Sequence, residues 1–424
     1  MIIIKKKEKH FFCFILSKYI EVKIFFVIRE PTAKMLVFYL TFFLFIGFRV
    51  NAFDVMRYAE VQYTKLYQEF LDSSKTFYPA YGYPLTTDWE RAVGPSYGWT
   101  QGFFPGVLWN LVEYNASQTS LKRAMDVTGP TAYFANVTNT QDVGFVIMPG
   151  FGNGYRLFKR SDYRDIIITG AHSLATRYSP IVRCTRSWDT PSGFLVVMDN
   201  MMNLEILFVA ANLTNNQTLY NMGWQHANRT MYEHFRENNG SYHVVIYNET
   251  DGSVIEKRTA QGYANWSTWA RGQSWSIYGF TQAYRFTGHR PFLDKAIGAT
   301  NYVLGRLSND TDLIPYWDYD APYNSTIPYQ PRDTSAGAIF ASALIELSEY
   351  VPTSELKNQY LTTAKTIIEQ LSSSKYMIYG NPDYKLSALL TNGTWGPYPK
   401  NPFDVSLSYG DYYLTQAIVR LSKL

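Results

Sequence analysis

Six short clusters of polar residues and glycines recur along this chain of 424 residues, and four of them contain an aspartate. A carboxylic acid can donate a proton to a reacting atom and, as a carboxylate, accept one from an attacking water. We therefore interpret these clusters as candidates for acid–base chemistry. They are Gly98–Gly102, Gln141–Gly144, Asp199–Asn200, Trp269–Gln273, Arg332–Ser335 and Tyr409–Asp411.

Asp142 and Asp199 also have a plain structural explanation. Aspartate is a favoured N-cap residue, because its carboxylate can accept the free backbone N–H groups of a helix's first turn. Taken alone, the two residues fit capping, and a catalytic role depends on the motifs around them. Asp333 and Asp411 are the next candidates for a catalytic carboxylate.

The elements that must position these clusters are mostly helices. Apolar residues recur at intervals of three and four in about twelve segments, and one β-hairpin is predicted from Tyr242–Tyr247 and Ser253–Arg258. The helical segments are Met56–Leu71, Phe103–Val112, Ala124–Phe134, Phe145–Phe158, Tyr163–Ala175, Met201–Ala211, Tyr220–Phe235, Ser274–Phe286, Phe292–Leu307, Ala336–Tyr350, Leu356–Leu371 and Tyr412–Leu421.

Every second helix begins at one of the polar clusters, whereas the helices between them are ordinary amphipaths. This alternation predicts an all-α (α/α)₆ barrel, in which six inner helices are surrounded by six outer ones. The N-termini of the inner helices would gather at one mouth, where their partial positive charge favours carboxylates and anionic ligands. An open α-solenoid is the alternative, but the chain has no fixed-period repeat of that kind.

The clusters, in this order and at these distances, resemble the unsaturated glucuronyl hydrolases, glycoside hydrolase family 88. The resemblance extends from about Asp54 to the C-terminus. It implies an (α/α)₆ barrel without a metal or other cofactor. The matching stretches are WTQGFFPGVLW at Trp99–Trp109, QDVGF at Gln141–Phe145, DNMMNL at Asp199–Leu204, QGYANWSTWARGQSWSIYGF at Gln261–Phe280, DTSAGAIFAS at Asp333–Ser342 and YGDYY at Tyr409–Tyr413.

The resemblance also implies the reaction. The substrate would be a lyase-generated oligosaccharide whose non-reducing uronic acid carries a C4=C5 double bond. The family hydrates this enol ether: protonation at C4 builds oxocarbenium character at C5, water adds there, and the resulting hemiketal opens and releases the rest of the saccharide. Asp199 matches the family's general acid/base, and Asp142 matches its second essential aspartate, a nearby like charge.

Seven further residues fall on family positions and are expected to bind the substrate. His243 and Gln261 would lie near the reacting carbons and the water. Arg271 is a natural fork for a carboxylate, or else it pairs with a structural acid on a crowded inner helix. Trp99, Trp188 and Trp275 are candidate stacking platforms for sugar rings, and each also fits the core. The seven are His243, Gln261, Trp269, Arg271, Trp275, Trp99 and Trp188. Lys400–Ser408 maps onto no family residue securely, so sulfate preference stays open.

The charge of the chain argues against a nucleic-acid partner. Residues 1–52 hold nine basic and three acidic side chains, and the remainder has 30 basic and 32 acidic ones, a net charge of −2. A nucleic-acid binder would present a basic face. An anionic ligand must therefore be held by a few placed residues.

The first 52 residues are expected to be a leader. The apolar run Leu36–Phe48 is too short to span a bilayer, and Val50–Ala52 ends in a small residue suited to signal peptidase. Met35 precedes the run, so we expect translation to start there and the mature barrel to comprise residues 53–424. A membrane-bound signal anchor is the alternative.

A secreted protein with no membrane attachment after processing follows from that leader. Eleven Asn-X-Ser/Thr sites fit N-glycosylation in the secretory pathway. After removal of the leader, Cys184 is the one cysteine left, so no intrachain disulfide or cysteine-based metal site can form. The sites are Asn115, Asn136, Asn212, Asn216, Asn228, Asn239, Asn248, Asn265, Asn309, Asn324 and Asn392.

Three other functions remain open at this point. An unsaturated rhamnogalacturonyl hydrolase would share the barrel and the chemistry, although the sequences around Asp199 and Arg271 favour the glucuronyl branch. A sugar 2-epimerase would need paired histidines, and the chain has only six histidines in all. A secreted sugar-binding barrel with an inactive site is the non-enzymatic alternative. The oligomeric state does not follow from the sequence.

Overall fold

The computed structural model describes residues 2–7, 10–15, 55–94, 98–325 and 328–424. The chain divides into two compact units, residues 1–53 and 54–424. In the first unit, β1 (Ile2–Lys7) pairs antiparallel with β2 (His10–Ile15). The expected signal segment, residues 35–52, lies outside the described residues. Over the described ranges, no helix has both the length and the apolarity to cross a bilayer.

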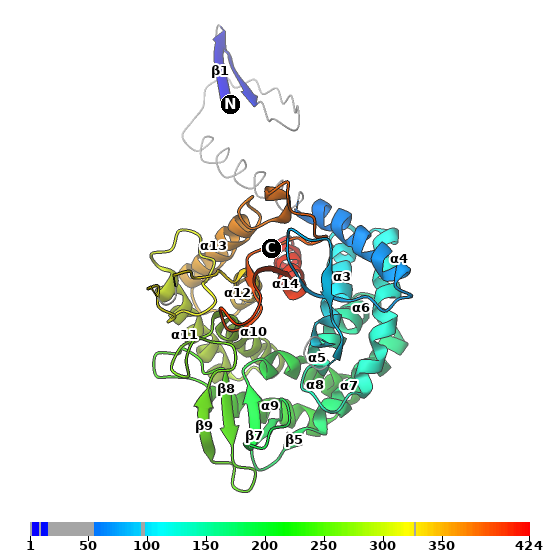
Figure 1. The fold of residues 1–424 in the computed structure, drawn as a ribbon, viewed down its shortest axis with the longest axis vertical. Coiled ribbons are helices and arrows are strands. Elements are labelled where there is room, and N and C mark those ends of the chain that lie inside the picture. The colour runs from blue at the N-terminus through cyan, green and yellow to red at the C-terminus, as the bar shows by residue number, and fades with distance from the viewer. Residues whose placement is uncertain (1, 8–9, 16–54, 95–97, 326–327) are drawn as a thin grey trace. The chain divides into compact units, whose positions relative to one another are not determined.

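The second unit is a ring of inner helices surrounded by outer helices (Figure 1). Each inner helix contacts the next, and the last contacts the first, which closes the ring. The inner ring consists of α3 (Phe103–Asn115), the interrupted helix α5 (Val143–Ile147), η3 (Met148–Gly152) and α6 (Asn153–Phe158), then α8 (Asn200–Thr214), α10 (Ala270–Thr287), α12 (Thr334–Leu347) and α14 (Ser408–Leu421).

The outer ring alternates with the inner one along the chain, as predicted. The (α/α)₆ barrel is therefore confirmed. The outer helices are residues 55–72, α4 (Gln118–Thr128), α7 (Ser161–Ala175), α9 (Gln217–Glu233), α11 (Arg290–Leu307) and α13 (Ser354–Leu371).

The two rings differ in how they bury their residues. Every residue of α12 is buried, and its small side chains let neighbouring helices approach from both sides. By contrast, α13 buries one stripe, which includes Tyr360, Ala364 and Leu371, and exposes the opposite face. A helix whose residues are buried on all sides is covered by other elements all round, whereas a surface helix buries one stripe of residues and exposes the rest.

Two predicted helices are interrupted where proline enters them. The segment predicted at Phe145–Phe158 turns through the π-helical η3 at Pro149, because proline has no N–H to donate to the preceding turn. The segment predicted at Ala124–Phe134 instead ends as α4 at Thr128 and continues as the 3₁₀ helix η2 (Gly129–Asn136) with Pro130 in its first turn.

Short sheets connect the helices at the mouth. The predicted hairpin is confirmed as β8 (Val244–Tyr247) and β9 (Val254–Arg258), and an unpredicted strand, β7 (Phe194–Val197), joins it to give the order β7-β8-β9. All pairs are antiparallel. Beneath it, β5 (Tyr178–Ser179) pairs with β6 (Cys184–Thr185), and Cys184 is fully buried against Phe194 and Val245.

A second sheet joins segments from the two ends of the barrel chain. Its order is β10-β11-β3-β4, all antiparallel. The strands are β3 (Pro79–Gly82), β4 (Trp89–Arg91), β10 (Gly393–Thr394) and β11 (Phe403–Leu407). The 3₁₀ helix η1 (Gly98–Gly102) follows β4 and leads into α3.

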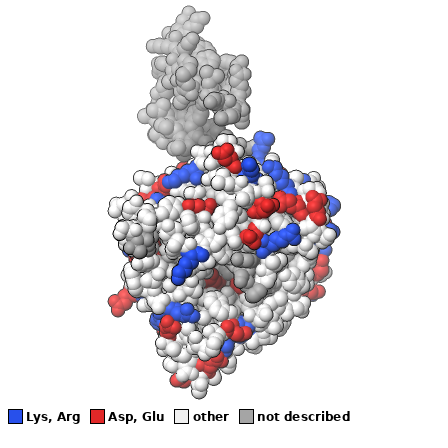
Figure 2. Space-filling view, viewed as in Figure 1, with Lys and Arg blue, Asp and Glu red and all other residues white. Residues whose placement is uncertain are grey.

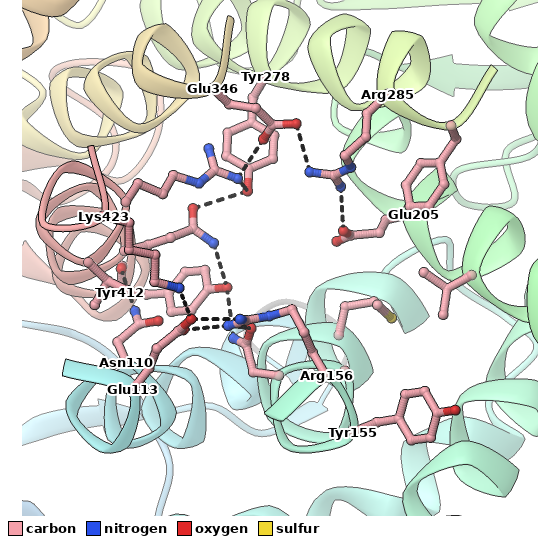
Figure 3. Close-up of a pocket in the computed structure, with 18 of the residues that line it drawn as sticks. Asn110, Glu113, Tyr155, Arg156, Glu205, Tyr278, Arg285, Glu346, Tyr412 and Lys423 are labelled. Carbon is pink, nitrogen blue, oxygen red and sulfur yellow. Dashed lines mark hydrogen bonds and ion pairs between the residues drawn. The ribbon is translucent and has the colours of Figure 1, made fainter. Parts of the chain in front are cut away.

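The end of the barrel opposite the mouth contains a polar cavity of about 510 Å³ (Figure 3). Ion pairs link the inner helices around it. Glu113 of α3 pairs with Arg156 of α6 and with Lys423 beyond α14. Arg420 of α14 and Arg285 of α10 both pair with Glu346 of α12 at 2.7 Å, and Arg285 also pairs with Glu205 of α8 at 2.8 Å. We call these seven residues the ionic ring.

Candidate active site

The sheet β7-β8-β9 brings the first two candidate residues together. Val197, the last residue of β7, pairs with Val244, the first residue of β8. Asp199 follows β7 and His243 precedes β8, so both side chains lie at the same end of the sheet. Their closest atoms, Asp199 Oδ2 and His243 Nε2, are 3.4 Å apart.

The chain that follows strand β9 determines which ring nitrogen of His243 carries the proton. The last residue of β9, Arg258, lies opposite Val244, so the chain beyond it passes the His243 ring. The backbone N–H groups of Ala260 and Gln261 both point at His243 Nδ1, at 3.2 and 3.3 Å. A nitrogen that accepts two donors carries no proton, so the ring holds its proton on Nε2, facing Asp199.

Asp142 lies at the start of α5, on the neighbouring inner helix. It accepts hydrogen bonds from Thr140 Oγ1 at 2.7 Å and from Gln141 Nε2 at 3.0 Å. Burial, with a smaller contribution from the negative charge of Asp199, raises the pKa of Asp142 to about 6, although the hydrogen bonds from Thr140 and Gln141 oppose the shift. A carboxyl group with this pKa exchanges a proton near neutral pH.

Close packing of α5 against α8 sets the two aspartates side by side. Asn203 Oδ1 on α8 accepts the backbone N–H of Phe145 on α5 at 2.7 Å. Gly144 contributes by having no side chain: a Cβ there would lie 2.7 Å from the Cα of Asn203. The cluster Gln141–Gly144 therefore places one carboxyl group and one close helix contact together.

The capping explanation is wrong for both aspartates. Asp142 and Asp199 occupy the N-cap positions of α5 and α8, yet neither side chain accepts a hydrogen bond from its helix. Asp199 Oδ2 is buried without a hydrogen-bond partner within the described residues. Asp333, by contrast, caps α12 through the N–H of Ser335 at 3.1 Å.

Arg271 is buried and is surrounded by protein acceptors. Its Nη1 donates to Asp333 Oδ2 at 2.6 Å and to the Thr394 carbonyl at 2.7 Å. Its Nη2 donates to Gln261 Oε1 at 2.9 Å and to the Trp395 carbonyl at 2.6 Å. Since each Nη carries two hydrogens, these contacts use all four. The geometry fits the structural alternative, and a direct contact with a substrate carboxylate stays a prediction.

Comparison with known proteins identifies the family. Residues 85–382 match Glycosyl Hydrolase Family 88. The chain belongs to this family. An unsaturated glucuronyl hydrolase of Formosa agariphila is 37% identical over 335 residues, which cover 78% of this chain and 81% of the relative. An unsaturated chondroitin disaccharide hydrolase of Streptococcus pyogenes serotype M1 is 27% identical over 80% of this chain and 85% of its own.

Solved structures agree. The crystal structure of an unsaturated glucuronyl hydrolase specific for heparin superposes with a TM-score of 0.80 at 31% identity, over 88% of this chain and 98% of its own. An enzyme of Streptococcus agalactiae in complex with dGlcA-GalNAc6S superposes with a TM-score of 0.69 at 25% identity, over 87% of this chain and 92% of its own. Both are unsaturated glucuronyl hydrolases.

Within this family 88 barrel, the candidate tryptophans differ in position. Trp269 is buried and packs against His243, with ring centroids 4.4 Å apart and the ring planes tilted by 37°. Trp275 is fully buried between Phe145 and Tyr413, which fits the core alternative. Trp99 is half-buried at the mouth.

Trp188 is the most exposed of the candidates, at 39%. It lies in the loop between β6 and β7, and the preceding Ser187 carbonyl accepts the N–H of Gln141 at 3.2 Å. Trp188 therefore borders the side of the site that holds Asp142. Stacking by any of these tryptophans stays a prediction.

Three residues at the site were not predicted from the sequence. Thr140 and Asn203 bond to Asp142 and to the start of α5, and Trp395 lies against Trp99, with ring centroids 5.9 Å apart. Asn203 stands inside the DNMMNL match and could have been noticed. Trp395 follows a two-residue strand and belongs to none of the motifs, so no signal pointed to it.

The geometry supports one acid–base centre. Asp199 faces an Nε2–H donor and lies beside a second carboxyl group that titrates near pH 6. Among the described residues, His, Cys, Asp and Glu side chains form no group of three or more that would suit a metal ion. Lys and Arg are interspersed with Asp and Glu on the face shown in Figure 2, and neither sign of charge dominates it.

Proposed function

We propose that this chain is a hydrolase that removes the unsaturated uronic acid from the non-reducing end of lyase-generated oligosaccharides. The observation that carries the proposal is the position of the Asp199 carboxyl group and the contacts that it makes. The carboxyl group lies at the mouth and caps no helix, its Oδ2 has no hydrogen-bond partner among the described residues, and His243 Nε2 lies 3.4 Å from that oxygen. Family membership supports the same activity, since the relatives are named for unsaturated glucuronyl and chondroitin substrates.

In the proposed reaction, Asp199 acts first as an acid. Its carboxylic acid gives its proton to C4 of the C4=C5 bond, and positive charge develops on C5 and the ring oxygen. The carboxylate formed then accepts a proton from water as the water oxygen bonds to C5. Asp199 thus recovers its proton. The hemiketal at C5 opens to a ketone, and the hemiacetal left at C1 releases the remaining saccharide.

The other residues of the site would assist this cycle. His243 donates through Nε2, which can hold Asp199 or orient the water, and the two backbone N–H groups at Nδ1 prevent the ring from turning over. Asp142 supplies a neighbouring group whose protonation changes near pH 6. Its charge would favour positive charge building on the sugar ring.

The test uses unsaturated disaccharides made by lyases from chondroitin, heparin and rhamnogalacturonan. Loss of the enol-ether absorbance would show hydration, and its ranking across the panel would identify the branch of substrate. Activity on the rhamnogalacturonan product alone would favour the unsaturated rhamnogalacturonyl alternative. Binding without loss of absorbance would favour an inactive sugar-binding barrel.

We further propose that the protein is secreted, N-glycosylated and free of the membrane after its leader is removed. The apolar run Leu36–Phe48 and the Asn-X-Ser/Thr sites support this route. N-terminal sequencing of material from the culture medium should begin near Phe53. A product that retains Met1, or one that stays with the membrane fraction, would exclude it.

A further inference from the structure

The candidate residues form a closed circuit of contacts around the mouth. From Asp199 the contacts run through His243 and Gln261 to Arg271, and from there to the Trp395 carbonyl. Trp395 then packs on Trp99, and Trp99 packs on Phe145, whose helix begins beside Asp142. Trp395 therefore lies across the mouth from the acid–base centre, on the same rim.

Trp395 belongs to a cluster of four aromatic side chains that are buried to different degrees. We call this cluster, which consists of Trp395, Trp99, Tyr81 and Tyr409, the aromatic wall. Its ring centroid lies 5.2 Å from that of Tyr81 and 6.1 Å from that of Tyr409. Tyr81 and Tyr409 are buried, whereas Trp99 and Trp395 are only half-buried. The two tyrosines thus form the backing of the wall, and the two tryptophans remain partly exposed at the mouth. Indole faces are large, rigid and apolar, which suits the C–H face of a sugar ring.

The Trp395 backbone is held by a buried ion pair. Arg271 is 1% exposed and Asp333 is 0% exposed, and Arg271 Nη1 lies 2.6 Å from Asp333 Oδ2. The guanidinium is also packed between the Trp269 and Tyr409 rings, 4.6 and 5.2 Å from their centroids. Two further hydrogens of the guanidinium bind the Thr394 and Trp395 carbonyls, so the loop after β10 is fixed to α10 and α12.

We propose that Trp395 is a saccharide-stacking residue of the site and that the Arg271–Asp333 pair positions it together with Gln261. The ring would stack on the sugar beyond the unsaturated uronic acid, because the wall stands across the mouth from Asp199. Arg271 then acts through the residues it holds and needs no free donor for the substrate. This inference rests on the proposed function, whose substrate it extends by one sugar unit.

The stacking residue is tested with Trp395→Ala and Trp395→Phe on an unsaturated chondroitin disaccharide and the matching tetrasaccharide. One aromatic contact is worth about 0.5–1.5 kcal/mol, so KM should rise about two- to tenfold in Trp395→Ala, with kcat nearly unchanged, and Trp395→Phe should recover most of the loss. Tyr232→Ala, which removes an aromatic ring exposed at 69% on the outer helix α9, should match the parent.

The positioning role of the Arg271–Asp333 pair is tested with Arg271→Lys and Asp333→Asn, each made in the parent and in Trp395→Ala. If the pair positions Trp395, each change raises KM in the parent and raises it less in the Trp395→Ala background. A purely structural pair would lower Tm equally in both backgrounds and leave KM unchanged in the folded fraction.

The outcomes separate the two proposals. An inactive parent overturns the proposed function. An active parent whose KM is unchanged by Trp395→Ala overturns the stacking role alone, and that variant is informative even if the Arg271 and Asp333 variants fail to fold.

Discussion

At the scale of single residues, Asp199 and Asp142 are both aspartates at N-cap positions, and their surroundings make them different. Asp199 faces one imidazole donor, and Asp142 accepts two hydrogen bonds from its own segment. Neither caps its helix. Substitutions at these positions should therefore separate chemistry from stability.

Asp199→Asn should lower kcat about 10²–10⁴-fold, the usual range for a general acid–base group. The amide has the same shape but cannot give a proton to C4 or accept one from water. Tm should barely move, because no capping hydrogen bond is lost. The measurement is kcat on an unsaturated disaccharide with a parallel thermal melt. Near-normal turnover, or a loss of activity matched by unfolding, would rule out the assigned role.

Asp142→Asn should change how stability depends on pH. The pKa of Asp142 is raised from 3.8 in the unfolded chain to about 6 in the folded one. A raised pKa means that the folded state binds the proton more tightly, so this group's contribution is full below pH 4 and is lost as pH rises through 6. The asparagine variant does not ionise, so it should be more stable than the parent above pH 6.

Melting curves of the parent and of Asp142→Asn between pH 4 and pH 8 check this. The difference in Tm should grow in favour of the variant across that window. Two parallel curves would show that Asp142 does not change its proton affinity on folding.

At the scale of elements, the sheet β7-β8-β9 and the α5–α8 contact place the site. The hairpin was predictable, because two β-rich stretches flank the turn-forming Glu249–Gly252. Strand β7 was not, since four successive apolar residues have no alternation that distinguishes a strand from a buried helix. The twelve helices could be predicted because the two kinds of helix differ in composition.

The site was predictable only where a motif surrounds the residue. Asp199, His243 and Gln261 converge on one end of the sheet, as expected from their family positions. The contacts of Arg271 with Thr394 and Trp395 join residues more than 120 positions apart. No local pattern encodes a contact of that kind, which depends on how the last two inner helices close the ring.

Gly144→Ala tests the α5–α8 contact. The new Cβ would meet Asn203 at 2.7 Å, so α5 must move away from α8 and carry Asp142 with it. Overpacking of this kind costs about 1–3 kcal/mol, and we expect both Tm and kcat to fall. Gly129→Ala is the control, because a Cβ there meets no atom within 4 Å and φ is −48°. If Gly144→Ala behaves like Gly129→Ala, the contact does not position the site.

At the scale of the whole molecule, the candidate site lies at one end of the barrel and the ionic ring lies toward the other. The N-termini of the inner helices carry the candidate site, and the ionic ring surrounds the cavity in Figure 3, with Glu205 near the middle of α8 and most of its other members near the C-termini of their helices. Burial alone would raise the pKa of Glu346, but Arg285 and Arg420 hold it below its ordinary value. Within the described residues no ion pair joins Glu205 to Arg156, so the ionic ring is open between α8 and α6.

Glu346→Gln should destabilise the barrel by about 1–3 kcal/mol, because it removes the charge of a buried carboxylate that Arg285 and Arg420, both partly exposed, share. The loss should be greatest above pH 5, where the parent carboxylate is charged, and should shrink in acid. Chemical denaturation at pH 7 and pH 4 measures it. Glu237→Gln, at an exposed position, is the control.

Activity should respond differently from stability. Well below its Tm, Glu346→Gln should retain the parent's kcat and KM, since the substitution lies at the opposite end from Asp199. A large fall in kcat of the folded variant would show that the two ends are coupled.

Finally, the reactivity of Cys184 should report how often the barrel opens locally at the site. Cys184 is the one thiol in residues 54–424, it is completely buried beneath the sheet that carries Asp199 and His243, and burial raises its pKa. A thiolate is the form that an alkylating reagent attacks, so modification can proceed only when this sheet opens. The rate of alkylation under native conditions therefore reports the free energy of local opening at the site. A bound saccharide that steadies the mouth should slow it, which gives a binding assay that needs neither turnover nor an engineered label.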